Sequence, residues 1–222
     1  MALTRAEIAK ILLFGNPKKY TWATKPSAAS VPAGRIIFIT DVGGWNGTTH
    51  SGSFWFSNGT LWRPVSGVLL LASTNTRAQM ANDTSEQTMY SYTLKGGVMA
   101  VGDSIRVSGK TDYAGSTSTV TIRGRYDTAE FFGQAGISYG YGIFQHSFHN
   151  RATSTQLIGV VEPPTHNTIS SFNSGQNQGS NPRLSTISVD SSIDRAISLT
   201  MQKSVITDAM YFDSLQIELL AG

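Results

Sequence analysis

The chain has 222 residues, enough for a sizeable core and for one or two domains. Its charged fraction of 14% is low, and its hydrophobic fraction of 40% is too high for a disordered chain. The absence of cysteine excludes disulfides, thiolate metal sites and cysteine nucleophiles. Low charge together with abundant Ser, Thr, Asn and Gly favours a β-rich, turn-rich protein whose surfaces are covered in an assembly.

The net charge of +3 is unevenly distributed. Residues 1–35 hold six basic residues and one acidic residue, whereas residues 36–222 hold eleven basic and thirteen acidic residues. A basic head on a near-neutral body indicates either a docking arm for an acidic partner or a solvated, frayed terminus, and the sequence leaves both open. No basic stripe interleaved with aromatic residues follows in the body, so we expect no nucleic-acid binding.

Residues 4–14 have the pattern of one short amphipathic helix. Thr4 and Glu7 form a capping box at its start. Eleven residues are too few for a stable isolated helix, so its apolar face is expected to dock on another surface. The segment lacks the pattern of a signal peptide, and no run approaches the ~20 apolar residues of a membrane span. The expected docking residues are Ile8, Ile11 and Leu12 as apolar anchors, with Lys10, Lys18 and Lys19 at the rim.

Residues 16–33 are predicted to form an extended linker. Pro17, Pro26 and Pro32 lie among alanines and serines, a composition typical of a spacer and not of a packed element. The helix and this linker together make residues 1–33 the expected docking arm.

Residues 34–72 are expected to form a small β unit. Phe54–Phe56 and Leu61–Pro64 are the predicted arms of a hairpin that turns at Asn58-Gly59, because Asn-Gly between apolar runs supplies two residues with positive φ. Ile36–Thr40 is expected beside this hairpin. Three short strands are marginal alone, so the tryptophans should be covered by a core or by a subunit contact. The tryptophans of this unit are Trp45, Trp55 and Trp62.

The stretch from Pro26 to Ala72 carries PAGRIIFITDVGG (residues 32–44) and FWFSNGTLWRPVSG (residues 54–67). In these runs the chain resembles small tail-fibre, head-fibre and decoration-type virion proteins of tailed bacteriophages. The resemblance supplies no catalytic residues. It implies a structural role, a homotrimer of the kind common among phage fibres, and capsid, portal or tail proteins as partners. It also implies a location in the virion after synthesis in the host cytoplasm.

Residues 73–222 show one strand pattern after another. Leu215–Leu219 and Thr117–Tyr126 alternate apolar and polar residues with period 2. About eight such strands separated by turn clusters favour an antiparallel β-sandwich, and eight is the usual number in a jelly roll. The expected fold class is therefore all-β: a jelly-roll-like antiparallel sandwich preceded by the Trp-rich hairpin unit and the short helix. His166–Asn181 is expected to be a long polar loop.

Two patterns raise the question of enzyme or metal chemistry. His146 and His149 are three residues apart, which places them on opposite faces of a strand, so we expect packing or surface positions and no metal site. Glu130 is the best single candidate for a glycosidase carboxylate, because nearby aromatic residues would raise its pKa. Such an enzyme needs a second carboxylate in the same groove, and a turn carboxylate is the alternative. We therefore predict no enzyme activity, cofactor or metal.

Tyr139 and Tyr141 lie in a glycine-rich SYGYG run. They offer either a sugar-stacking platform or a sheet corner or subunit contact. The leading hypothesis is a fibre or receptor-binding trimer, anchored by its N-terminal arm, whose outward sandwich is also a candidate for binding host surface glycan. The alternatives are a capsid decoration, cement or head-fibre protein without receptor binding and, less favoured, a glycan depolymerase.

Overall fold

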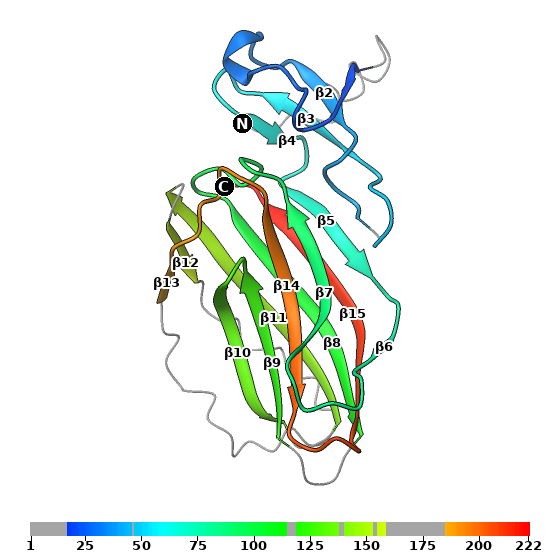
Figure 1. Cartoon of the computed structure of the whole chain (residues 1–222). Helices are drawn as coiled ribbons and strands as arrows, with labels where there is room; N and C mark the ends of the chain where they lie inside the picture. Colours follow the sequence, from blue (N-terminus) through cyan, green and yellow to red (C-terminus); the bar gives the residue numbers. More distant parts are fainter. Residues whose placement is uncertain (1–16, 46, 115–118, 138–139, 153–154, 159–184) are drawn as a thin grey trace. The chain divides into compact units, whose positions relative to one another are not determined.

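The computed structural model places most of the described residues in β-strands (Figure 1). The helix found among them is the short 3₁₀ helix η1 (Ala28–Ser30), and no helix in this part of the chain could cross a membrane. The chain divides into two compact units: residues 1–73 with 217–222, and residues 74–216. The structure describes residues 17–45, 47–114, 119–137, 140–152, 155–158 and 185–222. The helix predicted over residues 4–14 and the loop predicted over residues 166–181 lie outside these ranges.

The first unit contains a four-stranded sheet. Its strands, in sheet order, are β1 (Lys19–Tyr20), β2 (Ile36–Ile39), β3 (Ser53–Ser57) and β4 (Trp62–Pro64). β1 pairs in parallel with β2, while the β2–β3 and β3–β4 pairs are antiparallel. The predicted hairpin is therefore confirmed, with the strand of residues 36–39 beside it.

The hairpin turn differs in detail from the expected one. Ser57 pairs with Trp62, so four residues lie between the strands. Gly59 takes a φ of 92°, but Asn58 does not have positive φ. Asn58 instead accepts hydrogen bonds through Oδ1 from the amides of Thr60 and Leu61, at 3.0 and 2.8 Å. The asparagine thus acts through its side chain, as short polar residues do in turns.

The core of the first unit joins tryptophans and aliphatic residues of the sheet to Trp22 and Ala28 of the segment 21–33. The Trp22 and Trp55 rings meet edge to face, with centroids 4.9 Å apart. Trp62 Nε1 donates to the Pro26 carbonyl at 2.8 Å, and Ser57 Oγ donates to the Ala28 carbonyl at 2.9 Å. Trp55 and Trp62 are buried, whereas Trp45 is half-buried with its ring against His50.

The extended, unpacked linker predicted over residues 16–33 is wrong for the described part of that stretch. Tyr20 pairs with Ile39, and Trp22 is buried in the core. The backbone of this segment is not fully paired in the sheet, so some of its carbonyl groups are available as acceptors. The carbonyls of Pro26 and Ala28 accept hydrogen bonds from Trp62 and Ser57, two side chains that the sheet buries.

The remaining strands form two further sheets, built largely from antiparallel pairs. The smaller has the order β10 (Ala129–Ile137), β9 (Val120–Tyr126), β14 (Arg195–Lys203), β7 (Gln87–Leu94). The larger has the order β13 (Ser185–Ile187), β12 (Thr155–Ile158), β11 (Gly140–Ala152), β8 (Ser104–Ala114), β15 (Ala209–Leu220), β5 (Val68–Thr74), and β6 (Ala78–Gln79) also pairs with β15.

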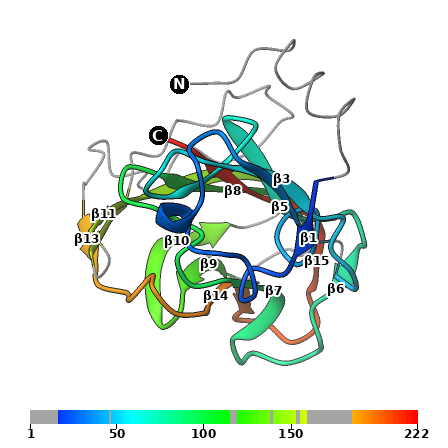
Figure 2. The ribbon, with the colours of Figure 1, turned by 90° about the horizontal axis from the view of Figure 1, so that it is seen from above.

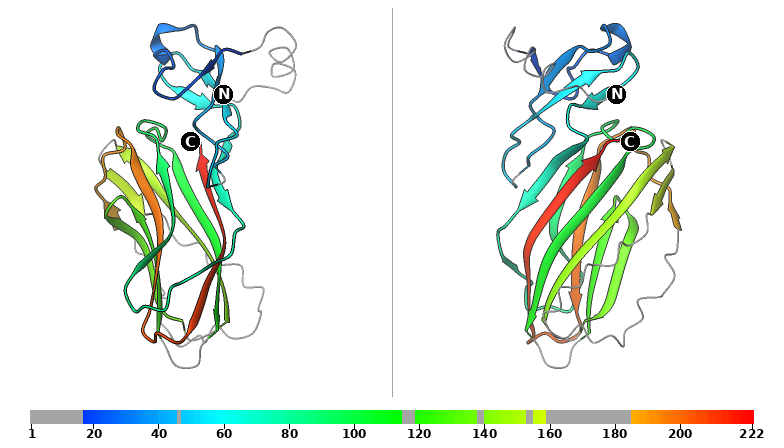
Figure 3. Two further views of the ribbon diagram at one scale, coloured as in Figure 1. Left: turned by 45° about the vertical axis from the view of Figure 1, so that its right-hand side comes forward. Right: turned by 180° about the vertical axis from the view of Figure 1, so that it is seen from behind.

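Most strands of these two sheets belong to the second unit, where the sheets form separate layers, with β14 in one and β15 in the other (left view of Figure 3). The view from above also separates β8 and β11 from β9 and β14 (Figure 2). Aromatic rings join the layers: Tyr126 of β9 stacks on Phe148 of β11 with centroids 4.9 Å apart. The predicted all-β class and antiparallel sandwich are confirmed.

Two antiparallel ladders, one in each layer, organise this sandwich. β9 and β10 pair around a turn at Asp127, whose φ is 56°, and β8 pairs with β11 in the other layer. The β9–β10 ladder begins at Tyr126 and Ala129, beside the turn, and the β8–β11 ladder includes the pair Tyr113–Gly140. The two ladders belong to different sheets, and the Tyr126–Phe148 stack joins them across the core.

Candidate functional site

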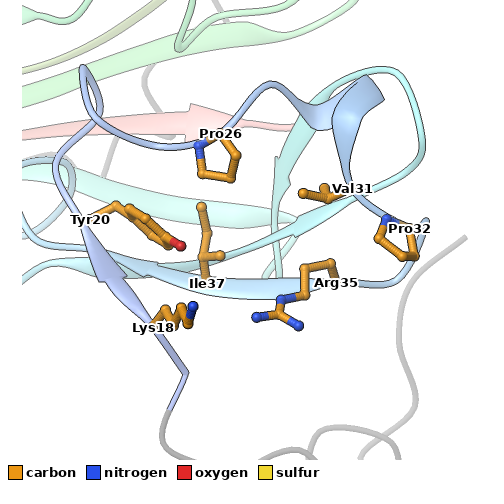
Figure 4. Close-up of a pocket in the computed structure, with 7 residues that line it drawn as sticks. All are labelled: Lys18, Tyr20, Pro26, Val31, Pro32, Arg35 and Ile37. Atoms are coloured by element: carbon orange, nitrogen blue, oxygen red, sulfur yellow. The ribbon is translucent and has the colours of Figure 1, made fainter.

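A pocket of about 320 Å³ opens in the first unit (Figure 4). Ile37, which is buried, is the apolar centre of the lining. Figure 4 shows the ring of Pro26 on one side of Ile37 and the Lys18 and Arg35 side chains on the other. The lining residues are Lys18, Tyr20, Pro26, Val31, Pro32, Arg35 and Ile37.

Strand pairing determines which basic residue reaches this pocket. Lys19 pairs with Phe38 in the parallel β1–β2 ladder, so these two side chains share one face of the sheet. Lys18 is one residue earlier and therefore lies on the Ile37 face, where it lines the pocket. The two lysines predicted to act together consequently lie on opposite faces.

The basic residues between positions 17 and 35 have different roles. Lys18, Lys19 and Arg35 are exposed. Lys25 is used internally, because its Nζ lies 3.8 Å from the Trp22 ring centroid and donates to the Trp22 carbonyl at 3.0 Å. Burial lowers the pKa of Lys25, and the nearby Asp41 charge opposes that shift. The positive charge available to a partner at the pocket thus comes from Lys18 and Arg35.

No acidic residue lies among the seven that line the pocket. Its polar side-chain groups are the Lys18 ammonium, the Arg35 guanidinium and the Tyr20 hydroxyl, and the other lining side chains are proline rings and aliphatic groups. A guanidinium can bind a carboxylate through two parallel hydrogen bonds. The arrangement is therefore suited to a ligand that carries both negative charge and an apolar group.

The opposite face of the same sheet is also apolar. Ile36 pairs with Phe56 and Phe38 pairs with Phe54, which places these four side chains on one face. The Phe38 and Phe54 rings meet edge to face at 5.0 Å, and Phe54 remains 38% exposed. Sequence reasoning missed this second face, although its signal was present: β2 and β3 are apolar at successive positions, and not only at alternate ones.

Most of the predicted binding residues cannot be placed. Ile8, Lys10, Ile11 and Leu12 lie outside the described residues. So do Tyr139 and the side chain of Tyr141, whose backbone pairs with Asp112 in the β8–β11 ladder. Among the predicted docking residues that the structure does describe, Lys18 is in the pocket and Lys19 is not. Sequence reasoning missed the remaining pocket residues, which are Tyr20, Pro26, Val31, Pro32, Arg35 and Ile37.

Glu130 is exposed on the second unit, and the two aromatic residues that follow it, Phe131 and Phe132, are buried away from solvent. This carboxylate is therefore not buried among the aromatic rings, as a raised pKa would require. Its Oε2 instead lies 3.4 Å from Arg123 Nε. A second carboxylate, Glu86, also pairs with Arg123, so both belong to one surface ion-pair cluster.

Glu86 is the centre of that cluster. It accepts a short hydrogen bond from Thr200 Oγ1 and pairs with Arg125 at 3.0 Å. The Thr200 hydroxyl, followed by the Arg125 and Arg123 guanidiniums, holds the pKa of Glu86 below its usual range. This environment stabilises a charged carboxylate and does not favour a protonated one.

The two histidines of β11 are separated by the strand as expected. The His146 ring stacks on Phe132, with centroids 4.0 Å apart and an interplanar angle of 13°, and burial lowers the pKa of His146 to about 4. His149 belongs to the alternate set of side chains in the same strand. Within the described residues, no three metal-binding side chains lie together.

Comparison with known proteins gives little for this chain. No protein-family description matches it, and no curated protein matches it. One similar solved structure is a β-1,3-glucanase from Mycobacterium marinum, with 9% identity and a TM-score of 0.23 over 92% of this chain and 99% of that one.

Proposed function

We propose that the protein is a structural component of a tailed-bacteriophage virion and that its first unit attaches it to the particle. The observation that carries the proposal is the pocket of the first unit, where Lys18 and Arg35 flank an apolar lining. A compact unit with one cationic, partly apolar pocket is a suitable attachment module. In this proposal the sandwich faces outward, the protein is a trimer, and its partners are capsid, portal or tail proteins.

The residues that carry the virion-protein resemblance support this assignment, because they build the module itself. Gly44 takes a φ of 65°, and a Cβ there would lie 1.8 Å from Ser51 Oγ, so the turn requires glycine. Ser53 Oγ donates to the Val42 carbonyl at 2.7 Å and accepts from Trp55 Nε1 at 2.8 Å. These residues therefore specify a folded module, and their role goes beyond composition.

The attachment test uses purified protein and particles that lack it. Wild-type protein should co-sediment with such particles and should be visible on their surface by electron microscopy, on the head or on the tail. Light scattering should give a mass near three times 23.9 kDa. A chain that never labels any particle would refute the virion role, and a monodisperse monomer would refute the trimer.

The same experiment separates attachment by residues 17–73 from attachment by residues 1–16. A truncation must end at residue 16, because Tyr20 and Trp22 belong to the sheet and core of the first unit. If the chain lacking residues 1–16 is folded but does not bind, those residues are also required for attachment. If it binds as well as wild type, residues 1–16 are not required.

A further inference from the structure

We propose that the pocket of Figure 4 binds an acidic peptide segment of the particle, with one proline or aliphatic side chain inside the pocket and carboxylates on Lys18 and Arg35. The inference rests on the proposed attachment function and names the partner chemistry that such an attachment would use.

The size and lining of the pocket favour a side chain of an extended segment. About 320 Å³ is at the lower end of the volumes that hold small ligands. Val31 and Pro32 line it beside Ile37, so the interior contacts are apolar. Proline rings at positions 26 and 32 have a fixed φ, which limits how far this wall can collapse or open. The pocket therefore provides a preformed apolar contact for one or two residues.

The charges of Lys18 and Arg35 indicate which residues of the bound peptide should neighbour the side chain that enters the pocket. Lys18 and Arg35 are both exposed, and they come from different segments, one before β1 and one before β2. Neither cation faces an acidic residue within the pocket lining. A peptide with acidic residues near its apolar one would place carboxylates on both cations. Such charge pairs at a rim mainly increase the association rate and make binding salt-dependent.

Other anionic ligands fit less well. A uronic-acid glycan also carries carboxylates, but its hydroxyl groups need acceptors, and the Tyr20 hydroxyl is the one side-chain acceptor among the seven lining residues. Nucleic acid would match the two cations, but its bases would find one aromatic ring, Tyr20, for stacking. A peptide that is apolar between its charges matches the whole lining.

The test is fluorescence anisotropy with the full-length protein. The probe is a fluorescein-labelled, C-terminally amidated peptide Asp-Glu-Pro-Val-Asp-Glu. Its controls are the same peptide with Asn and Gln in place of the acids, and a labelled polyglucuronate hexasaccharide. The acidic peptide should bind, its affinity should fall as salt increases, and the neutral peptide should bind at least about tenfold more weakly.

A matched set of variants distinguishes the pocket from general electrostatic attraction. Lys18→Glu and Arg35→Glu should each weaken peptide binding by about tenfold or more. Lys19→Glu makes the same charge change one residue away but on the opposite face, so it should change affinity by less than about twofold. Tryptophan fluorescence identifies any variant that fails to fold.

Several results would overturn the proposal. These are no detectable binding at a peptide concentration of about 1 mM, equal weakening by Lys19→Glu, or preference for the hexasaccharide. The attachment assay separates this proposal from the function on which it rests. Wild-type protein that joins particles but binds no acidic peptide refutes the pocket assignment alone. Protein that binds the peptide but never joins a particle refutes the virion role.

Discussion

The two units bury aromatic side chains in different ways. In the first unit two of the buried tryptophans also make a polar bond: Trp62 Nε1 donates to the Pro26 carbonyl, and Trp55 Nε1 donates to Ser53 Oγ. In the sandwich, rings meet rings across two layers, as Tyr126 and Phe148 do. The first unit is held by specific bonds between a sheet and an irregular segment, whereas the sandwich is held by the area of two facing sheets.

This difference has a physical cause. A sheet of short strands without a facing sheet buries little apolar area and is marginal alone. Tryptophan brings a large apolar surface together with one N–H group, which can tie an irregular segment to the sheet. The same N–H must be satisfied when it is buried, so the first unit depends on a few positions. The sandwich should tolerate single changes better, and the following predictions test that contrast.

The largest effect is expected from Trp62→Ala in the first unit. The change removes a ring that is 7% exposed together with its bond to Pro26, and it should lower the free energy of unfolding by ~3–5 kcal/mol. Hydrogen exchange should show lost protection in β2, β3 and β4, while β9 and β10 keep theirs.

Trp62→Phe is the matched control for that experiment. It keeps most of the buried ring and removes the Nε1–H donor, so it separates packing from hydrogen bonding. Its cost should be about 1–3 kcal/mol, the usual range for leaving a buried carbonyl without its donor. Unchanged protection in the alanine variant would show that the ring is not part of the core. Equal loss of hydrogen-exchange protection in both units would show that they unfold together.

The second prediction concerns pH and the sandwich. Burial lowers the pKa of His146 from its ordinary 6.5 to about 4, so between these values the unfolded chain binds a proton that the folded chain does not. Stability should therefore be complete above pH 6.5 and fall as the pH decreases toward 4. At pH 4.5 the loss from this residue should be about 2–3 kcal/mol.

Urea unfolding at pH 7 and pH 4.5 measures the His146 effect. His146→Phe keeps a ring against Phe132 but cannot take up a proton, so it should lose less stability than wild type between the two pH values. His149→Gln, in the alternate set of side chains of the same strand, serves as the control and should keep the wild-type pH dependence. If His146→Phe loses as much stability as wild type between pH 7 and pH 4.5, the His146 ring is solvated in the folded protein.

Much of the sandwich could be predicted from sequence, because the alternation of apolar and polar residues along a strand is a local signal. Leu215, Ile217 and Leu219 alternate with polar residues, and the structure buries all three in β15. The Asn58-Gly59 turn was predictable for the same reason, since the pattern lies within a few residues of the turn. This alternation does not indicate which strands pair with one another.

The first unit was harder to predict, because its key contacts join distant residues. The Trp22–Trp55 contact and the two-residue β1–β2 pairing leave no periodic pattern in the sequence. A segment with prolines therefore had the composition of a linker while serving as the cover of the sheet. The candidate site was missed for the same reason: Arg35 reaches the pocket of Lys18 only once β1 pairs with β2 in parallel.

The third prediction asks how tightly the sandwich core is packed. A Cβ on Gly124 of β9 would lie 2.2 Å from Phe132 Cε1 and 2.7 Å from Phe131 Cζ, so Gly124→Ala should cost about 1–3 kcal/mol. Gly133→Ala on the neighbouring strand is the control, because its Cβ would meet the exposed Glu130 carboxylate, which can move. Thermal unfolding of both variants gives the comparison. Equal melting temperatures would show that the two rings shift at little cost.

The smallest effect should come from Glu86→Gln, which tests whether polar contacts matter equally in the two units. Glu86 holds Arg123, Arg125 and Thr200 together on the sandwich surface, where solvent screens charge. Its lowered pKa means that this stabilisation is present at neutral pH and is lost as the pH falls past the ordinary glutamate range and through the lowered folded pKa.

Because the pairs are exposed, Glu86→Gln should cost less than about 1 kcal/mol at pH 7, and the cost should shrink in high salt. Glu130→Gln, which loses the 3.4 Å contact with Arg123, is the control and should cost less still. Urea midpoints at low and high salt measure both variants. A cost equal to that of Trp62→Phe would contradict the contrast drawn between the units. It would mean that a surface cluster stabilises the sandwich as strongly as a buried bond stabilises the first unit.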